Sequence, residues 1–174
     1  MALAITVGRG QKRPQGELIE LDEKNAVDSL GQALSEHTGI EAWWSGGIFL
    51  NCHRSIERWL SQQIIGVDVD YHDPLDQHAP LTDEARESLA GALPKAPCTW
   101  GHLTPRGARL VVLLDTPIID RLMYPLAWSS LIAHLGQWLP KIEVGTLRID
   151  QQCRDLARYF WSPRATVGGV ARGQ

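Results

Sequence analysis

Residues 63–73 read QIIGVDVDYHD, an apolar run that ends in two carboxylates placed two residues apart. The run has the length expected of a buried β-strand, and the side chains of a strand alternate between the two faces of a sheet. Asp68 and Asp70 are therefore expected to point to the same face. Magnesium and manganese take oxygen ligands, and neighbouring carboxylates repel each other unless a cation or a proton neutralises them. The stretch predicts half of a metal site.

The same residues also fit a simpler structure. A strand often ends in acidic residues because the chain leaves the core there and meets water, and Asp73-Pro74 is itself a turn signal. A solvated strand end is therefore the alternative for Asp68 and Asp70 taken alone. The choice depends on whether other parts of the chain supply further ligands.

The composition is that of one compact domain. The chain has 174 residues with 44% hydrophobic content, which is enough to bury one core, and we expect a single domain over residues 1–165. Residues 166–174 are rich in glycine and have no periodicity. We expect them to form a flexible tail or the start of a linker.

The overall charge gives no sign of a nucleic-acid partner. The 17 basic and 20 acidic side chains leave a net charge of -3, so the chain has no global positive field. A basic groove would have to be local. It would draw on eight arginines, namely Arg54, Arg58, Arg106, Arg109, Arg148, Arg154, Arg158 and Arg164.

The cysteines and the N-terminus bear on the cellular compartment. Cys52, Cys98 and Cys153 are widely spaced and odd in number, which argues against a disulfide framework and favours a reducing compartment. The N-terminus lacks a basic segment followed by a long apolar run, and no stretch approaches membrane-spanning length. We therefore expect a soluble, cytoplasmic protein.

Strands and helices are expected to alternate irregularly, with hairpin-like pairs. Asp22 and Thr82 are expected helix N-caps, and Gly39 and Pro94 are expected to end the two helices that follow them. The other expected elements are strands over residues 3–7, 18–21, 42–44, 48–50, 99–104 and 110–114, and a helix over residues 125–139. This order suggests an α+β fold in which helices cover one side of a sheet.

Three separated segments then line up in one order. The first is Asp68-Val69-Asp70, the second is the turn Thr104-Pro105-Arg106-Gly107-Ala108-Arg109 leading into Leu110–Leu114, and the third is Ile149-Asp150, followed by Arg158 and Pro163. Together they resemble the catalytic core of the archaeo-eukaryotic primase superfamily, the primase-polymerases common on plasmids and phages. The resemblance covers roughly residues 63–163, and it depends on the order and separation of the motifs because each is short.

The resemblance implies a fold, an activity and partners. The fold would be an α+β catalytic domain with an RRM-like (RNA-recognition-like) antiparallel or mixed sheet, helices packed on that sheet, and an N-terminal α/β extension. The activity would be template-directed nucleotidyl transfer by a DNA primase-polymerase that replicates a mobile element. The partners would be a single-stranded DNA template, NTP or dNTP, and a helicase domain or protein.

The resemblance also implies roles for individual residues. The catalytic acids, which would hold two Mg²⁺ or Mn²⁺ ions, would be Asp68, Asp70 and Asp150. The nucleotide-binding residues, which would neutralise the triphosphate, would be Arg106, Arg109 and Arg158. Contacts with the DNA template would come from Arg54 and Arg58 and from exposed aromatic residues such as Trp43 or Trp44, on which unpaired bases can stack.

Arg109 is a departure from the family pattern. The second motif of the family usually has a histidine at this place, which contacts the incoming nucleotide. An arginine can hold a triphosphate through paired, charge-assisted hydrogen bonds. Nucleotide binding is therefore compatible with the change.

Other interpretations of the same residues stay open. A metal-dependent nuclease or phosphodiesterase would use the same acids on water, and a degenerate primase fold would bind nucleic acid without catalysis. Asp150 also fits a surface ion-pair cluster with its neighbouring arginines. Zinc is a further alternative, with ligands from Cys98-x-x-x-His102 and Cys52-His53.

Overall fold

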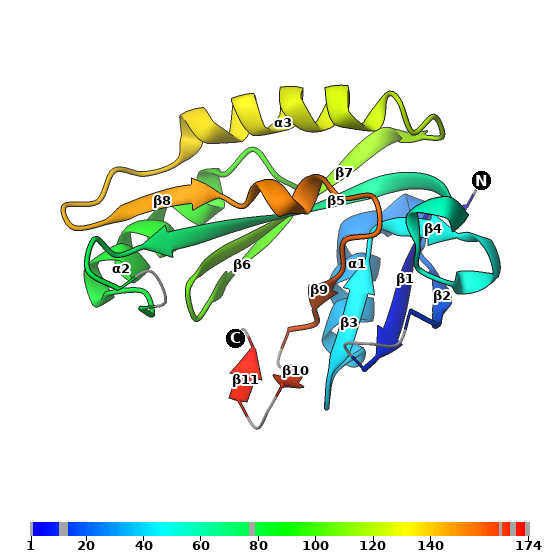
Figure 1. Cartoon of the computed structure of the whole chain (residues 1–174), viewed down its shortest axis with the longest axis horizontal. Helices are drawn as coiled ribbons and strands as arrows, with labels where there is room; N and C mark the ends of the chain where they lie inside the picture. Colours follow the sequence, from blue (N-terminus) through cyan, green and yellow to red (C-terminus); the bar gives the residue numbers. More distant parts are fainter. Residues whose placement is uncertain (1, 11–13, 77–78, 164, 168–169, 173–174) are drawn as a thin grey trace.

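The computed structural model describes residues 2–10, 14–76, 79–163, 165–167 and 170–172. Over these residues the chain mixes antiparallel sheets with three α-helices, which confirms the predicted α+β class. One sheet has four strands, in the order β2 (Gly16–Glu20), β1 (Ala4–Arg9), β3 (Ala42–Ser45) and β9 (Phe160–Trp161). Another has five strands, in the order β4 (Gly47–Phe49), β5 (Trp59–His72), β7 (Gly107–Ile118) and β6 (Trp100–Thr104), with β8 (Thr146–Ile149) also paired to β5, and a third sheet has two strands. Figure 1 shows the four-stranded sheet at one end of the molecule and the five-stranded sheet along the rest.

The four-stranded sheet is built mainly from the first third of the chain. Its strands are β1 (Ala4–Arg9), β2 (Gly16–Glu20), β3 (Ala42–Ser45) and β9 (Phe160–Trp161). Helix α1 (Ala26–Glu36) contributes Leu30 and Leu34 to a core shared with Ile5 and Val7 of β1. The predicted N-cap Asp22 accepts a hydrogen bond from the backbone N–H of Lys24 and caps the short 3₁₀-helix η1 (Glu23–Asn25), which leads into α1.

The five-stranded sheet is organised around the long strand β5 (Trp59–His72). The strands β7 (Gly107–Ile118), β4 (Gly47–Phe49) and β8 (Thr146–Ile149) pair with β5, and β6 (Trp100–Thr104) pairs with β7, all antiparallel. Buried Val67, Val69 and Tyr71 alternate along β5 with Asp68 and Asp70. Both acids therefore lie on one face of the sheet, as the alternation of strand side chains requires.

Two helices lie beside this sheet and meet at their C-terminal ends. These are α2 (Asp83–Ala92) and α3 (Tyr124–Trp138), and Trp138 of α3 donates its indole N–H to the carbonyl of Ala92 at 3.1 Å. Their buried side chains include Leu89 of α2 and Trp128 of α3. The predicted N-cap of α2 is confirmed, because the Thr82 hydroxyl accepts a hydrogen bond from the backbone N–H of Ala85 at 3.2 Å. Among the described residues, no helix has the length and apolar character needed to cross a membrane.

The remaining helical turns are short 3₁₀ segments: η2 (Leu50–Cys52), η3 (Ile56–Arg58), η4 (Leu93–Lys95) and η5 (Gln151–Arg154). In the stretch expected to be a tail or linker, Ala165–Val167 and Val170–Arg172 pair as the hairpin β10–β11. Residues 168–169 and 173–174 lie outside the described residues. The expected linker stays a prediction.

The strands β3 and β4 follow each other along the chain but belong to different sheets. The chain crosses between the sheets at Gly46, where an added Cβ atom would lie 1.7 Å from the carbonyl oxygen of Ile64. Thr6 of β1 donates its hydroxyl proton to the carbonyl of Gly47 at 2.8 Å and so fixes the start of β4 against the small sheet. Two strands that look adjacent in the sequence therefore connect the sheets instead of pairing with each other.

Replacing Gly46 by alanine should lower the free energy of unfolding by about 1–3 kcal/mol, because the new methyl group would collide with the backbone of β5. Gly136→Ala is the control, since an added Cβ in that exposed part of α3 meets nothing within 4 Å. That variant should gain about 0.5–1 kcal/mol from the better helix propensity of alanine. Urea denaturation followed by circular dichroism measures both changes. Unaltered stability of Gly46→Ala would contradict the close approach of β3–β4 to β5.

Candidate functional site

Asp68 and Asp70 lie on β5 opposite the start of β7. Asp68 pairs across the sheet with Arg109, and Asp70 pairs with Gly107. A Cβ atom on Gly107 would lie 1.7 Å from the carbonyl oxygen of Val69, so glycine allows β7 to approach β5 closely at this point. The turn before β7 is tied down as well, because the backbone N–H of Tyr71 donates to the carbonyl of Arg106 at 2.7 Å.

Asp150 comes next to Asp68 through the pairing of β8 with β5. Val69 of β5 pairs with Ile149, the last residue of β8, and the backbone N–H of Asp150 then donates to the carbonyl of Asp68 at 2.9 Å. The Asp150 carboxylate caps η5 by accepting a hydrogen bond from the backbone N–H of Gln152 at 2.8 Å. Residues that are 82 positions apart by their numbers thus become neighbours.

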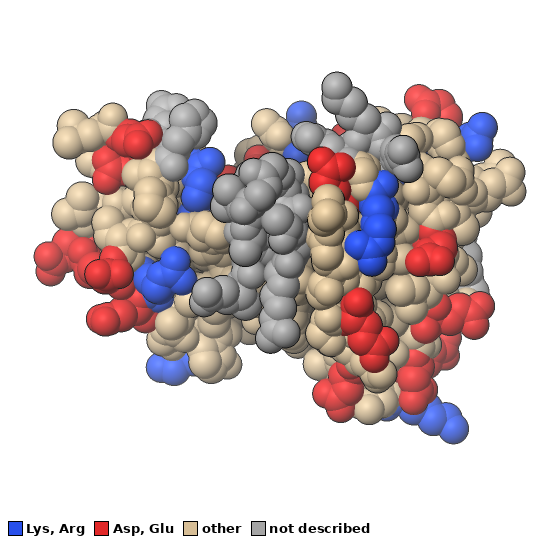
Figure 2. Space-filling view, turned by 90° about the horizontal axis from the view of Figure 1, so that it is seen from below, with Lys and Arg blue, Asp and Glu red and all other residues tan. Residues whose placement is uncertain are grey.

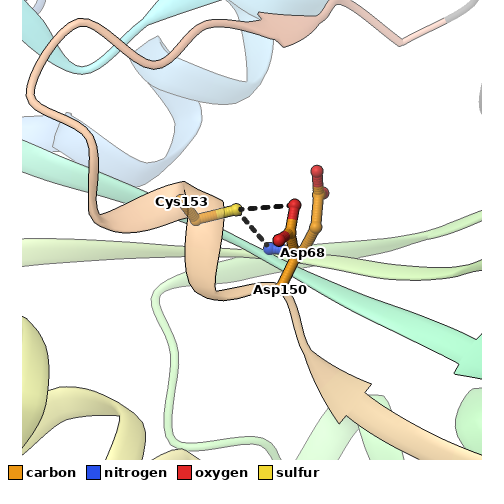
Figure 3. A group of neighbouring side chains, drawn as sticks. All are labelled: Asp68, Asp150 and Cys153. Carbon is orange, nitrogen blue, oxygen red and sulfur yellow. Dashed lines mark hydrogen bonds between the residues drawn. The ribbon is translucent and has the colours of Figure 1, made fainter.

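Cys153 completes a group of possible metal ligands with these two acids. One ligand atom from each of Asp68, Asp150 and Cys153 lies within 4.8 Å of the others (Figure 3). The sulfur accepts a hydrogen bond from the backbone N–H of Asp68 at 3.4 Å and donates to Oδ2 of Asp150 at 4.0 Å. Burial, followed by the nearby Asp68 charge, raises the pKa of Cys153 to about 12. At neutral pH this residue is a thiol, so the donors ready for a cation are carboxylate oxygens.

Arg109 forms a paired contact with Asp68. Its Nε donates to Oδ1 at 2.7 Å and its Nη2 donates to Oδ2 at 3.2 Å. The third guanidinium nitrogen, Nη1, donates to the carbonyl of Trp161 at 2.6 Å, and the group lies 4.9 Å from the centre of the Phe160 ring. The side chains of Arg109 and Asp68 are 11% and 16% exposed, so water screens this pair weakly.

Arg158 makes the corresponding contact with Asp150. Its Nη2 lies 3.0 Å from Oδ2 of Asp150, and its Nη1 donates to the side-chain oxygen of Gln152 at 3.2 Å. The Arg158 side chain is 30% exposed, which makes this pair more open to water than the Arg109 pair. Two of the three predicted catalytic acids therefore carry a guanidinium partner.

Asp70 is the third acid, and its surroundings disfavour its charged form. Partial burial is the largest cause that raises its pKa, and the Asp68 and Asp150 charges add to it. The positive charge of Arg106 and that of His72 act in the opposite direction and do not outweigh the causes that raise this pKa. This is the expected result where carboxylates crowd together in a low-dielectric site.

A cavity of about 290 Å³ collects these groups. It is lined by Asp68, Asp70, His102, Thr104, Pro105, Arg106, Arg109, Asp150, Arg158 and Trp161. All three predicted catalytic acids and all three predicted nucleotide-binding arginines therefore lie around one space. A larger hollow of about 660 Å³ beside the start of α3 has one carboxylate in its lining, that of Asp155, so size alone does not mark the site.

His102 and Trp161 line the same cavity. The sequence pointed to His102 only as a ligand in the zinc alternative, and Trp161 was in no motif. His102 lies on β6 directly across from Arg109. Burial is the main cause that lowers the pKa of His102 to about 4, and the Arg109 charge adds to the effect. The imidazole is therefore neutral at pH 7, and within the described residues its buried Nδ1 has no hydrogen-bond partner. Predicting that His102 enters this cavity would have required knowledge of the register in which β6 pairs with β7.

The residues predicted to contact the DNA template lie elsewhere. Arg54 is half-buried, donates from Nη1 to the carbonyl of Ala157 at 2.8 Å, and lies 4.4 Å from the ring centre of Tyr159 and 4.9 Å from that of Trp43. Arg58 is exposed at the end of η3 and does not line the cavity. The two are not stacked on one α-helix, because η3 begins at Ile56.

The prediction that Trp43 and Trp44 are exposed is wrong. Both are fully buried, Trp44 in the hydrophobic core and Trp43 with its ring beside Gly8 of β1. Trp44 packs against Phe160 with the ring centres 5.0 Å apart. These two residues therefore form part of the core and are not available to stack on unpaired bases.

The zinc alternative gains no support from the described residues. There the group of close metal-ligating atoms is Asp68, Asp150 and Cys153, and it excludes Cys98 and Cys52. The three cysteines are free thiols. On the face shown in Figure 2, the visible Lys and Arg side chains stand apart from one another, and visible Asp and Glu side chains lie toward both ends and between them.

Comparison of the chain with protein-family models, with curated proteins and with solved structures found no match. The resemblance to primase-polymerases therefore depends on the motifs and on the arrangement of their residues.

Asp70→Asn should stabilise the protein at neutral pH when a chelator keeps divalent cations away. The raised pKa of Asp70 means that its contribution to stability is present below the ordinary aspartate pKa and is lost as the pH rises through the raised value. The advantage of Asp70→Asn over the wild type should therefore grow between acid and neutral pH. Thermal unfolding at several pH values measures it, and exposed Asp115→Asn is the control. If the stability of the wild type increased relative to that of Asp70→Asn as the pH rises, the environment assigned to Asp70 would be wrong.

Proposed function

We propose that this cavity is the active site of a template-directed nucleotidyltransferase of the primase-polymerase kind. The observation that carries the proposal is the meeting of Asp68, Asp70 and Asp150 with Arg106, Arg109 and Arg158 around one space. Carboxylates near a triphosphate site are the usual holders of two divalent ions in phosphoryl and nucleotidyl transfer. Guanidinium groups are suited to bind the phosphate chain.

The order of the strands supports the RRM-like part of the proposal. The elements β5, α2, β6, β7, α3 and β8 follow each other as strand, helix, strand, strand, helix, strand. In the sheet they lie in the order β8-β5-β7-β6, with antiparallel neighbours throughout. This is the split arrangement of ferredoxin-like and RNA-recognition-like sheets. The small sheet with α1 would be the N-terminal extension.

The donor set fits Mg²⁺ or Mn²⁺ better than a soft metal. The carboxylate oxygens of Asp68, Asp70 and Asp150 are hard ligands, and the buried Cys153 is protonated at neutral pH. When bound, such ions would activate the attacking hydroxyl and stabilise the charge that develops on the phosphates. The three acids would hold the ions, and the three arginines would hold and orient the triphosphate.

The size of the cavity limits what it can enclose. Its volume of about 290 Å³ is at the lower end of the roughly 300–1,000 Å³ typical of small-molecule sites. We infer that the cavity encloses the phosphate chain and the reacting atoms, while the base and the template lie at its mouth. The choice between NTP and dNTP, the helicase partner and the mobile-element setting remain predictions from the resemblance.

The contacts of Asp68 and Asp150 also support a second candidate, a degenerate primase fold that binds nucleic acid without catalysis. Both carboxylates are already engaged by guanidinium groups, at 2.7 Å and 3.0 Å. Ion pairs of this kind can be structural. The experiment below separates this candidate from the enzyme.

Incubation with a single-stranded DNA template, a primer, all NTPs or dNTPs and Mn²⁺ should give extension or dinucleotide products. Asp68→Asn, Asp70→Asn and Asp150→Asn should each lower the rate by about 100-fold or more, because each removes a charged cation ligand worth several kcal/mol in the transition state. Asp115→Asn is the matched control, since this residue is exposed and does not line the cavity.

Other outcomes of this experiment identify the alternatives. Degradation of the template in place of extension would indicate a nuclease. DNA binding that needs no divalent cation and survives Asp68→Ala, with no product formed, would indicate the non-catalytic fold. Extension that survives all three asparagine variants would contradict the assigned site.

A further inference from the structure

The ion pairs in the cavity indicate whether cations and anions bind there separately or together. We propose that the site binds divalent cations together with a polyphosphate anion, and that Arg109 passes from Asp68 to the phosphates when that pair of ligands enters. The inference deepens the proposed function and rests on it, because it takes the carboxylates as cation ligands and the guanidiniums as phosphate ligands. It concerns binding, so it can be tested without turnover.

The charged side chains that line the cavity balance one another. Among the described residues, the cavity is lined by three carboxylates and three guanidiniums and by no lysine. The imidazole of His102 is neutral at pH 7 and does not disturb the balance. A free cation entering alone would leave the arginines facing positive charge, and a free triphosphate would face the carboxylates. A cation and a polyphosphate that enter together bring charges of both signs, so each meets an opposite charge.

The contacts of Arg109 allow it to exchange one anionic partner for another. Its Nη1 is anchored on the carbonyl of Trp161 at 2.6 Å, and Nε and Nη2 hold Asp68. A guanidinium makes the same forked contact with a phosphate as with a carboxylate. Rotation of the outer part of the side chain would thus exchange one anionic partner for another while the Trp161 contact is kept. The exchange frees both Asp68 oxygens for a cation.

A cation that bound alone would leave Arg109 without an anionic partner. A cation that displaces Arg109 from Asp68 without supplying a new anion leaves a guanidinium without its partner, on a side chain that is 11% exposed. Leaving a buried charge unpaired is strongly unfavourable. The pair of Arg158 with Asp150 faces the same exchange, and its greater exposure makes the exchange easier. Cation and polyphosphate should therefore strengthen each other's binding.

Electron paramagnetic resonance of free Mn²⁺ measures this coupling directly. The probe is a nucleoside triphosphate analogue with a non-hydrolysable bridge between the α- and β-phosphates. In the wild type the analogue should tighten Mn²⁺ binding by about tenfold or more, and Mn²⁺ should tighten binding of the analogue by the same factor. Arg109→Gln should bind Mn²⁺ without the analogue about tenfold more tightly than the wild type, and should lose most of the gain that the analogue brings.

The controls keep the test decisive. Arg154→Gln removes the same charge from the exposed end of η5, outside the cavity, and should behave like the wild type. Circular dichroism checks the fold of each variant. If Arg109→Gln does not fold, Arg158→Gln replaces it, because this pair lies nearer the surface and the same tightening of free Mn²⁺ is expected.

Two results would overturn the inference. One is a wild type that binds Mn²⁺ equally well with and without the analogue. The other is a folded Arg109→Gln or Arg158→Gln variant that binds free Mn²⁺ no more tightly than the wild type. Coupled binding without any primer extension would sink the polymerase function and leave the inference standing. Primer extension that needs all three acids, together with Mn²⁺ binding that the analogue does not tighten, would support the polymerase function and overturn the inference.

Discussion

The pairing of β8 with the end of β5 is the constraint on which the site depends. It places the backbone N–H of Asp150 on the carbonyl of Asp68, and from there the side chains of Cys153 and Arg158 follow within one short 3₁₀ turn and the loop after it. A shift of one residue in this register would turn alternate side chains to the other face of the sheet. The acids would then no longer share one space.

The segment from Asp150 to Trp161 also joins the two sheets. Arg158 accepts a hydrogen bond at its carbonyl from the Ser45 hydroxyl at 2.8 Å, and Phe160–Trp161 pair with β3. Trp161 in turn accepts a hydrogen bond from Arg109 of the large sheet. The cavity therefore lies where the sheets meet, and contacts that stabilise their junction also hold the arginines in place.

Local signals predicted the parts of this fold that depend on local structure. The alternation along β5 gave the shared face of Asp68 and Asp70, and the hydroxyl of Thr82 marked the start of α2. What failed depends on contacts between distant residues. Nothing near Trp43 in the sequence shows that β9 returns from position 160 to cover β3, and the entry of His102 into the cavity follows from the pairing of β6 with Arg109. Cys153 was not among the predicted ligands, and only the pairing of β8 with β5 places it beside two acids.

The arginine at position 109 is central to the charge balance of the cavity. A neutral histidine in its place could not neutralise Asp68, and three crowded carboxylates would then repel one another more strongly. The neighbouring His102 does not take over this part, because burial and the Arg109 charge keep it unprotonated at pH 7. Were His102 charged, the cavity would hold four cationic groups against three acids. The burial of His102 and the position of Arg109 therefore both keep the positive and negative charges of the cavity equal in number.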